Sequence, residues 1–294
     1  MKIIVTPRDA MQGLKQFIPT EVKADYINCL LKVGFDTVDF GSFVSPKAIP
    51  QLRDTTEVLK KLNLSSTKSK LLAIVCNLQG AKTGSEYSEI NSFGFPFSTS
   101  PTFLKRNINS TIEDVYNTIE EIQNICVKTN KDLVIYFSMA FGNPYGDEHN
   151  DYLVVEAIER LKKLQIKTIS LADTLGVGDN EIIARLFSYL DAKFRDIEFG
   201  LHLHVKQNEA IARIDGAYKV GCRHFDTALL GLGGCPLSGE EMVGNLSTEK
   251  LVEYLKLNKI QIPLNIALLK EAIIKAEEVF HFINDGNYHP NGIS

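Results

Sequence analysis

Two histidines in one strand-like run are the residues of this sequence best suited to bind a metal ion. The run FGLHLH at residues 199–204 alternates apolar and polar residues, as a half-buried β-strand does. Side chains two residues apart point to the same side of a strand, so the imidazoles of His202 and His204 can face one ion. The pattern also fits a strand that carries two histidines by chance, so further ligands have to be sought elsewhere.

A carboxylate and an amide from distant parts of the chain could complete such a site. Asp9 follows the first strand-like run, and Asn245 follows a glycine-rich segment. With His202 and His204 they would form a mixed nitrogen and oxygen site, which suits Mg²⁺ or Mn²⁺ and could also take Zn²⁺. Arg8 could stabilise an anionic oxygen or a developing enolate beside the ion. The pair Arg8 and Asp9 could equally be a salt bridge in a loop.

A cysteine and an aspartate in two further loops are also candidates. Cys235 lies in GLGGCP at residues 231–236, where glycines allow close approach of the backbone to a ligand and allow the loop to move. Its thiol could act as a general acid or base, or it could be an ordinary free cysteine. Asp173, in the run LADTLGVG, could orient one of the two histidines or could cap the turn that follows it.

The order of the predicted elements indicates how these residues come together. Short β-rich runs alternate with segments of helical period, and eight such strands favour a closed (β/α)8 TIM barrel over an open doubly wound sheet. Active sites of such barrels lie at the C-terminal ends of the strands, where the candidate residues fall. The predicted strands are 2–6, 37–40, 70–76, 89–95, 132–138, 167–171, 197–204 and 224–229, and the predicted helices are 20–33, 51–62, 111–128, 152–164, 181–190, 209–220 and one from residue 248.

We expect the segment 7–12, which carries Arg8, Asp9 and Gln12, to be a loop. The whole chain, 1–294, is expected to form a single domain, with a barrel over about 1–257 and a helical extension over about 258–294. One further helix is predicted over 264–282 within that extension.

Composition excludes several classes of partner. The net charge of −4 and the isoelectric point near 5.9 predict no nucleic-acid partner and no anionic membrane surface. No apolar run is long enough to span a bilayer. The five cysteines are scattered without a CxxC pair, which is typical of reduced thiols, so we expect a cytoplasmic protein.

Taken together, the motifs resemble those of the 3-hydroxy-3-methylglutaryl-CoA lyase family, metal-dependent acyl-CoA carbon–carbon lyases related to Claisen-type synthases. The resemblance covers residues 3–257, and the order of the motifs makes it specific. The motifs are TPRDAMQ at 6–12, SFVSPK at 42–47, NIN at 107–109, FGNPYG at 141–146, LADTLGVG at 171–178, HLH at 202–204, GLGGCP at 231–236 and GNLSTEKL at 244–251.

The resemblance implies a retro-Claisen cleavage of 3-hydroxy-3-methylglutaryl-CoA to acetyl-CoA and acetoacetate, a reaction of leucine degradation and ketone body formation. It implies Mg²⁺ or Mn²⁺ as cofactor, an acyl-CoA substrate and, as we expect, a homodimer. The implied metal ligands are Asp9, His202, His204 and Asn245. The implied catalytic residues are Arg8, Asp9, His202 and Cys235, and the implied substrate-binding residues are Arg8, Gln12, Asn77 and Asp173.

Some residues depart from the family pattern. Asp39 stands where the family usually has glutamate, and Val205 replaces the acidic residue after the second metal histidine. Ile4 replaces an acidic residue of the first strand, and Asn143 stands where many members have cysteine. The Cys235 loop is one residue longer than in the best-known members. A different 3-hydroxyacyl-CoA substrate is therefore an alternative.

Other functions are also compatible with the fold. A Claisen-type synthase or a pyruvate-dependent aldolase of the same group would use a similar metal site, but such enzymes usually carry a further C-terminal region. A catalytically silent binding barrel is a third alternative. The set formed by Arg8, Asp9, His202, His204 and Asn245 with Cys235 argues against a silent barrel.

Overall fold

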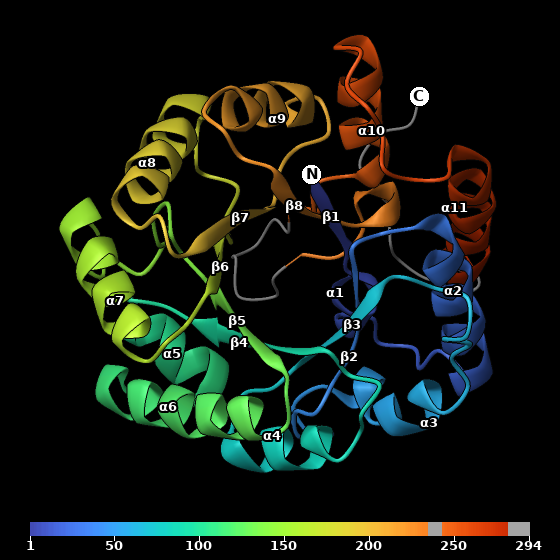
Figure 1. Cartoon of the computed structure of the whole chain (residues 1–294), viewed down its shortest axis with the longest axis horizontal. Coiled ribbons are helices and arrows are strands. Elements are labelled where there is room, and N and C mark those ends of the chain that lie inside the picture. Colours follow the sequence, from blue (N-terminus) through green and yellow to red (C-terminus); the bar gives the residue numbers. More distant parts are fainter. Residues whose placement is uncertain (235–242, 282–294) are drawn as a thin grey trace.

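Eight parallel strands close into a barrel, and a ring of helices surrounds it (Figure 1). This computed structural model describes residues 1–234 and 243–281. Each strand pairs with the next along the chain, and β8 pairs with β1 to complete the closure. The strands are β1 (Lys2–Val5), β2 (Thr37–Ser42), β3 (Lys70–Ile74), β4 (Ser92–Phe97), β5 (Asp132–Phe137), β6 (Thr168–Asp173), β7 (Glu198–Leu203) and β8 (His224–Thr227).

The described ranges contain the helices that a (β/α)8 barrel requires and some additional ones. They are α1 (Pro7–Gln12), α2 (Thr20–Val33), α3 (Thr55–Leu59), α4 (Leu78–Ser85), α5 (Pro101–Ile108), α6 (Ile112–Lys128), α7 (Asp151–Lys163), α8 (Asn180–Lys193), α9 (Ala210–Lys219), α10 (Thr248–Leu257) and α11 (Ile266–His281), with short 3₁₀ helices η1 (Pro50–Leu52) and η2 (Leu229–Gly231). No helix in these ranges is long and apolar enough to cross a membrane. The predicted TIM barrel is confirmed.

Three local predictions were wrong. The segment 7–12 is helix α1 rather than a loop, with Pro7 at the first helical position, where a missing N–H costs nothing. The single helix predicted over 51–62 is instead the short η1 followed by α3. Helices α4 and α5 were not predicted, because eight residues are too few to establish a helical period.

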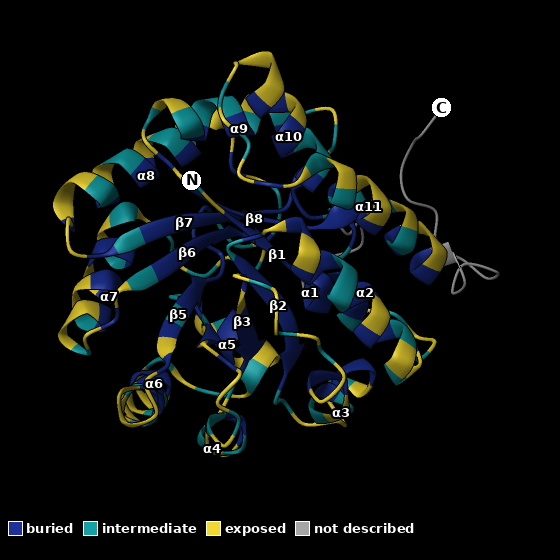
Figure 2. Cartoon of the chain, turned by 45° about the vertical axis from the view of Figure 1, so that its right-hand side comes forward, coloured by how far each residue is buried: buried dark blue, intermediate teal, exposed yellow. Residues whose placement is uncertain are grey.

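Alternate residues of the strands face two separate apolar regions. On β3, Leu71 and Ala73 join the large cluster that packs the barrel against its helices, whereas Leu72 and Ile74 join a small cluster with Tyr136. The strands are almost wholly buried, and the helices expose only the sides that face away from the barrel (Figure 2). The small cluster is therefore the apolar part of the barrel interior.

Helix α11 lies beside α2 on the outside of the barrel (Figures 1 and 2). The ring of Phe280 meets the ring of Tyr26 edge-on with centroids 5.9 Å apart. The backbone N–H of Asn265 donates to the carbonyl of Val33 at 2.9 Å, which holds the segment that leads into α11 against the end of α2. The helix predicted over 264–282 is thus confirmed, with bounds Ile266–His281.

Charged side chains occupy the part of the barrel interior between β7 and β8. The imidazole Nδ1 of His224 lies 2.9 Å from the carboxylate of Glu198, and its Nε2 lies 3.5 Å from that of Asp226. Although burial opposes a charged ring, Asp226 and Glu198 raise the pKa of His224 to about 9. The buried imidazole is therefore positively charged at neutral pH.

This raised pKa predicts a pH dependence of stability. The folded protein binds the His224 proton more tightly than the unfolded chain, so the stabilisation is complete below about pH 6.5 and is lost as pH rises through about 9. In EDTA, the free energy of unfolding should fall by roughly 2 to 3 kcal/mol more in the native protein than in His224→Phe over this range. Urea unfolding at a series of pH values measures the difference, and parallel curves for the two proteins would contradict it.

Candidate metal centre and active site

A cavity of about 130 Å³ lies among the ends of the strands and the loops that follow them. Of the residues expected to be functional, Arg8, Asp9, Gln12, His202 and His204 line it. The other lining residues are Ser42, Val44, Ile49, Ile74, Cys76, Pro96, Phe103, Asn107, Tyr136, Ser138, Ala172 and Thr174.

Helix α1 brings three polar side chains to one face. Residues three and four apart are neighbours on a helix, and Gln12 contacts both Asp9 and Arg8 in this way. Its amide nitrogen donates to Asp9 at 2.6 Å, and its carbonyl oxygen accepts from Nη1 of Arg8 at 3.0 Å. Arg8 also donates from Nη1 to Asp9 at 2.9 Å. The short helix thus holds the Asp9 carboxylate in a defined position.

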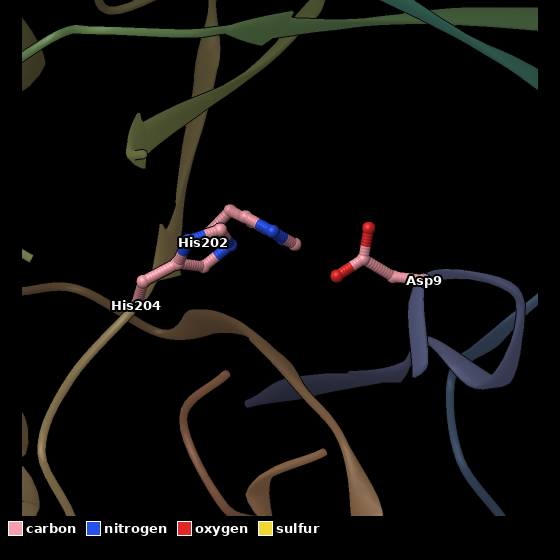
Figure 3. Close-up of side chains that lie close together, drawn as sticks. All are labelled: Asp9, His202 and His204. Atoms are coloured by element: carbon pink, nitrogen blue, oxygen red, sulfur yellow. The ribbon is translucent and has the colours of Figure 1, made fainter. Parts of the chain in front are cut away.

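The structure brings Asp9 together with the two histidines of β7 and its C-terminal end. One ligand atom from each of Asp9, His202 and His204 lies within 4.8 Å of the others, and all three residues are buried. Figure 3 shows the two imidazoles on one side and the Asp9 carboxylate pointing toward them from α1. In the described part of the chain, this is the single cluster of acidic, histidine or cysteine ligands with metal-binding geometry.

Hydrogen bonds fix the ring orientation of both histidines. Nδ1 of His202 donates to the carboxylate of Asp226 at 3.2 Å, and Nδ1 of His204 donates to the backbone carbonyl of Thr174 at 3.1 Å. Because both acceptors face Nδ1, that nitrogen carries the proton and Nε2 has a free lone pair. Both rings are therefore prepared to bind a metal through Nε2.

The charges of the cluster suit a cation. Burial opposes ionisation of Asp9, but Arg8 and the two histidines hold its pKa below the usual value, so it is a carboxylate at neutral pH. Burial and the neighbouring His202 lower the pKa of His204 to about 4, so this ring is neutral. Burial also disfavours charge on His202, but Asp226 and Asp9 outweigh it and raise its pKa.

Arg8 is held by a second buried carboxylate, Asp39 on β2. Nε and Nη2 of Arg8 donate to Asp39 at 3.0 and 2.5 Å. Burial raises the pKa of Asp39 to about 6, with Arg8 opposing the shift. With the bonds to Asp9 and Gln12, four of the five N–H groups of the guanidinium are used within the described residues. One Nη2–H remains for a ligand.

Asn245 contacts the cluster, but through its amide nitrogen. Nδ2 donates to Asp9 at 2.7 Å and to the carbonyl of Leu232 at 2.7 Å. Its binding to metal stays a prediction. Gly233 allows this close packing, since its φ is +91° and a Cβ there would lie 2.7 Å from Nδ2 of Asn245 and 2.9 Å from the Asp9 carbonyl oxygen. Cys235 itself lies outside the described residues.

Asp173 and Asn77 do not line the cavity in this structure. The Asp173 carboxylate accepts from the backbone N–H groups of Val177 and Gly178 at 3.1 and 2.9 Å, which is the turn-capping alternative. Burial raises its pKa to about 6 despite these bonds. Asn77 is the N-cap of α4 and accepts from Gly80 at 2.8 Å. Substrate binding by Asp173 and Asn77 stays a prediction.

Sequence reasoning missed three residues of the site. Asp226 lies two residues after His224, and the pattern HFD in β8 mirrors the alternation of polar residues in β7. Tyr136 lines the cavity, and its ring meets that of His202 edge-on at 5.7 Å. Asn107 comes from α5 and lies within the NIN motif at 107–109. The alternation of polar residues in β8 could have identified Asp226, and the NIN motif could have identified Asn107.

The three buried groups fit a divalent cation. A carboxylate and two imidazoles with free Nε2 atoms form a mixed oxygen and nitrogen donor set, which accommodates Mg²⁺, Mn²⁺ or Zn²⁺. The set differs from a closed structural zinc site, because no thiolate of the described residues belongs to it. The donors present therefore leave coordination positions for a substrate.

Removal of one imidazole should abolish tight metal binding without unfolding the protein. His204→Ala removes a donor from the cavity wall, whereas loss of an outer hydrogen-bond partner alone typically costs roughly 10- to 100-fold in affinity. We expect Mn²⁺ binding, followed by the electron paramagnetic resonance signal of free Mn²⁺, to weaken by more than about 100-fold. His149→Ala, at a half-buried histidine outside the cluster, is the matched control. Normal affinity in His204→Ala would exclude this metal site.

Comparison with known proteins agrees with this geometry. The model of the HMGL-like family matches residues 2–274. The chain is 32% identical to the cytoplasmic 3-hydroxy-3-methylglutaryl-CoA lyase of Homo sapiens over 92% of this chain and 73% of that protein, and 32% identical to a hydroxymethylglutaryl-CoA lyase of Bacillus subtilis over 90% and 87%.

A solved structure is similar over nearly the whole chain. The HMG-CoA lyase of Acinetobacter baumannii, in complex with coenzyme A and 3-methylmalate, superimposes with a TM-score of 0.88 at 28% identity over 99% of this chain and 98% of that one. Because the family model covers all eight strands of the barrel and the first part of α11, the chain belongs to the HMGL-like family.

Proposed function

We propose that this protein is a divalent-metal-dependent carbon–carbon lyase that cleaves 3-hydroxy-3-methylglutaryl-CoA to acetyl-CoA and acetoacetate. The observation that carries the proposal is the buried set of Asp9, His202 and His204 beside Arg8 in one cavity. Membership of the HMGL-like family and likeness to a lyase that binds coenzyme A support it. The proposed metal is Mg²⁺ or Mn²⁺, which the mixed oxygen and nitrogen donor set accommodates.

The reaction requires stabilisation of a thioester enolate. A base accepts the proton of the C3 hydroxyl as the C2–C3 bond breaks, so that the C3 oxygen becomes the ketone oxygen of acetoacetate. The electron pair of the broken bond becomes the enolate of acetyl-CoA. A bound divalent cation would supply Lewis-acid polarisation of substrate oxygens. The remaining Nη2–H of Arg8 can donate to the thioester oxygen, where negative charge develops. The bonds to Asp39 and Asp9 hold the guanidinium in place for this.

The enolate must also receive a proton on carbon to become acetyl-CoA. We assign this step to the thiol of Cys235, as the family resemblance implies. Gly233 precedes Cys235 and Asn245 follows it in the chain. The packing of Gly233 against Asp9 and Asn245 at the edge of the metal cluster supports the assignment. The loop that carries the cysteine therefore leaves and returns to the fold beside the proposed reaction centre.

The remaining proposed roles concern substrate binding. Gln12 lines the cavity and is the best placed of the substrate-binding residues other than Arg8. Asn77 and Asp173 would bind substrate only with a change in their present hydrogen bonds. Asn245 is proposed as a fourth metal ligand, which requires that its carbonyl oxygen replace the nitrogen that now faces Asp9.

The departures from the family pattern bear on substrate choice. Asn143 accepts from the backbone N–H groups of Tyr145 and Asp147 and donates to the carbonyl of Asp147, so it shapes its own loop. Val205 is buried and apolar, and support for the histidines comes from Asp226 and Thr174 instead. These replacements leave the metal cluster intact, so we propose the same reaction for this chain.

The proposed enzyme would act in the cytoplasm as a homodimer, and its reaction would serve leucine degradation and ketone body formation. The cytoplasmic location is supported by cysteines that form no disulfide among the described residues. Two exposed apolar side chains, Leu257 at the end of α10 and Ile274 on α11, could be covered by a second copy.

Acetoacetate release tests the reaction, substrate and metal together. Purified protein with (S)-3-hydroxy-3-methylglutaryl-CoA should release acetoacetate in the presence of Mg²⁺ or Mn²⁺ and should release none in EDTA. His204→Ala serves as the control for contaminating lyase, since it lacks one proposed ligand. If the metal-loaded protein binds Mn²⁺ but releases no acetoacetate, this substrate is wrong and other 3-hydroxyacyl-CoA thioesters become the next candidates.

Replacement of the loop thiol tests the proton donor. Cys235→Ser should lower kcat by about 100-fold or more, the usual contribution of a positioned acid or base, while the affinity for Mn²⁺ stays unchanged. Cys29→Ser, in helix α2, is the matched control. Unchanged turnover in Cys235→Ser would remove this cysteine from the mechanism.

A further inference from the structure

The inward faces of β7 and β8 carry a column of polar side chains below the metal cluster. Side chains two apart on a strand share a face, so Glu198, Gly200 and His202 point to one side of β7. His224 and Asp226 share a face of β8, and the register pairs His202 with Asp226. The two faces meet in contacts between Glu198, His224, Asp226 and His202, so they enclose one column.

The column forms a continuous series of contacts. Lys2 donates to Glu198 at 2.6 Å, and the other Glu198 oxygen accepts from Nδ1 of His224 at 2.9 Å. Nε2 of His224 lies 3.5 Å from Oδ1 of Asp226. Oδ2 of Asp226 accepts from Nδ1 of His202 at 3.2 Å. The series therefore connects a partly exposed ion pair at the start of the strands with a proposed metal ligand at their end.

One of the two carboxylate oxygens of Asp226 has His224 as its nearby positive group. Oδ2 accepts from Ser170 as well as from His202, whereas Oδ1 is buried and has no hydrogen bond within normal distance among the described residues. The neighbouring residue on β1 is Ile4, which is paired with Asp226 in register and offers no polar group. An unpaired carboxylate oxygen in the interior is costly, so the nearby imidazolium is its compensating group.

Space for the His224 ring is built into β7. A Cβ on Gly200 would lie 2.6 Å from Cδ2 of His224 and 2.9 Å from its Nε2, so no side chain fits at residue 200 while the ring is there. A glycine within a strand often marks the close approach of another group, and here that group is the imidazole. The lack of a side chain at Gly200 is thus what makes room for the His224 ring.

We propose that His224, held by Glu198, is a positioning residue for the metal centre: it keeps the Asp226 carboxylate in the orientation that directs Nε2 of His202 toward the metal. This inference rests on the proposed metal site. The hydrogen bond from His224 lowers the pKa of Glu198 to about 2, so the carboxylate that holds the ring stays charged. An ion pair with a purely structural role would change stability but leave metal affinity as it is.

Mn²⁺ affinity distinguishes the two roles. His224→Phe keeps a ring beside Gly200 but removes both N–H donors, and we expect Mn²⁺ to bind about tenfold more weakly, as after loss of an outer partner of a metal ligand. His224→Gln retains a donor for one carboxylate and should recover part of the affinity. The dissociation constant is measured from the free-Mn²⁺ signal on protein whose circular dichroism matches the native spectrum.

A second variant covers the case that His224→Phe does not fold. Glu198 lies at the partly exposed end of the column, and Glu198→Gln should weaken Mn²⁺ binding measurably, though by less than His224→Phe does. Glu113→Gln removes the same charge from an exposed ion pair with Arg160 and should have no effect. Native Mn²⁺ affinity in folded His224→Phe, or in Glu198→Gln when the former does not fold, would overturn the proposal.

The outcome separates this inference from the proposed lyase function. A native protein that cleaves the thioester while its His224→Phe variant keeps native Mn²⁺ affinity overturns the positioning role alone. A native protein that binds Mn²⁺ but cleaves no thioester overturns the lyase assignment, and the affinities of the variants still decide the role of His224. Absence of Mn²⁺ binding by the native protein overturns both.

Discussion

The hydrogen bond between His202 and Asp226 is the interaction through which the barrel interior decides which nitrogen of His202 faces the metal cluster. A histidine can present either ring nitrogen, and only an acceptor behind the ring decides which one. Asp226 provides that acceptor at 3.2 Å, and the Thr174 carbonyl does the same for His204 at 3.1 Å. Without these two contacts, the imidazoles would have no defined donor atom.

Burial of several charges in one barrel imposes a second constraint. Asp9, Asp39 and Asp226 are all almost inaccessible to solvent, and each needs a partner of opposite charge or several hydrogen bonds. Arg8 lies between Asp9 and Asp39, and Asp226 contacts both His202 and His224. The carboxylates and cations are therefore mutually dependent, and a change at one of them alters the site as a whole.

The periodic elements and the cluster of ligands could be predicted from the sequence because they depend on local rules. Strands with alternating or continuous apolar residues are readable from a few positions, and parallel barrels collect their polar strand ends at one face. Asp9 and the two histidines were expected to meet for this reason, and they do. Short helices such as α1 and α5 escaped prediction, since Pro7–Gln12 and Pro101–Ile108 span too few turns to show a period.

By itself, the sequence determined the (β/α)8 fold, the family and five of the side chains that line the cavity, because these follow from strand count, motif order and residue chemistry. Only the tertiary structure decided which groups hydrogen-bond to the predicted metal ligands and hold them in position. Asp173 caps its own turn, and the support of His202 comes from Asp226, paired across β7 and β8. The sequence gives no partner for His224, because its contacts with Glu198 and Asp226 exist only when the strand register and the space beside Gly200 are formed.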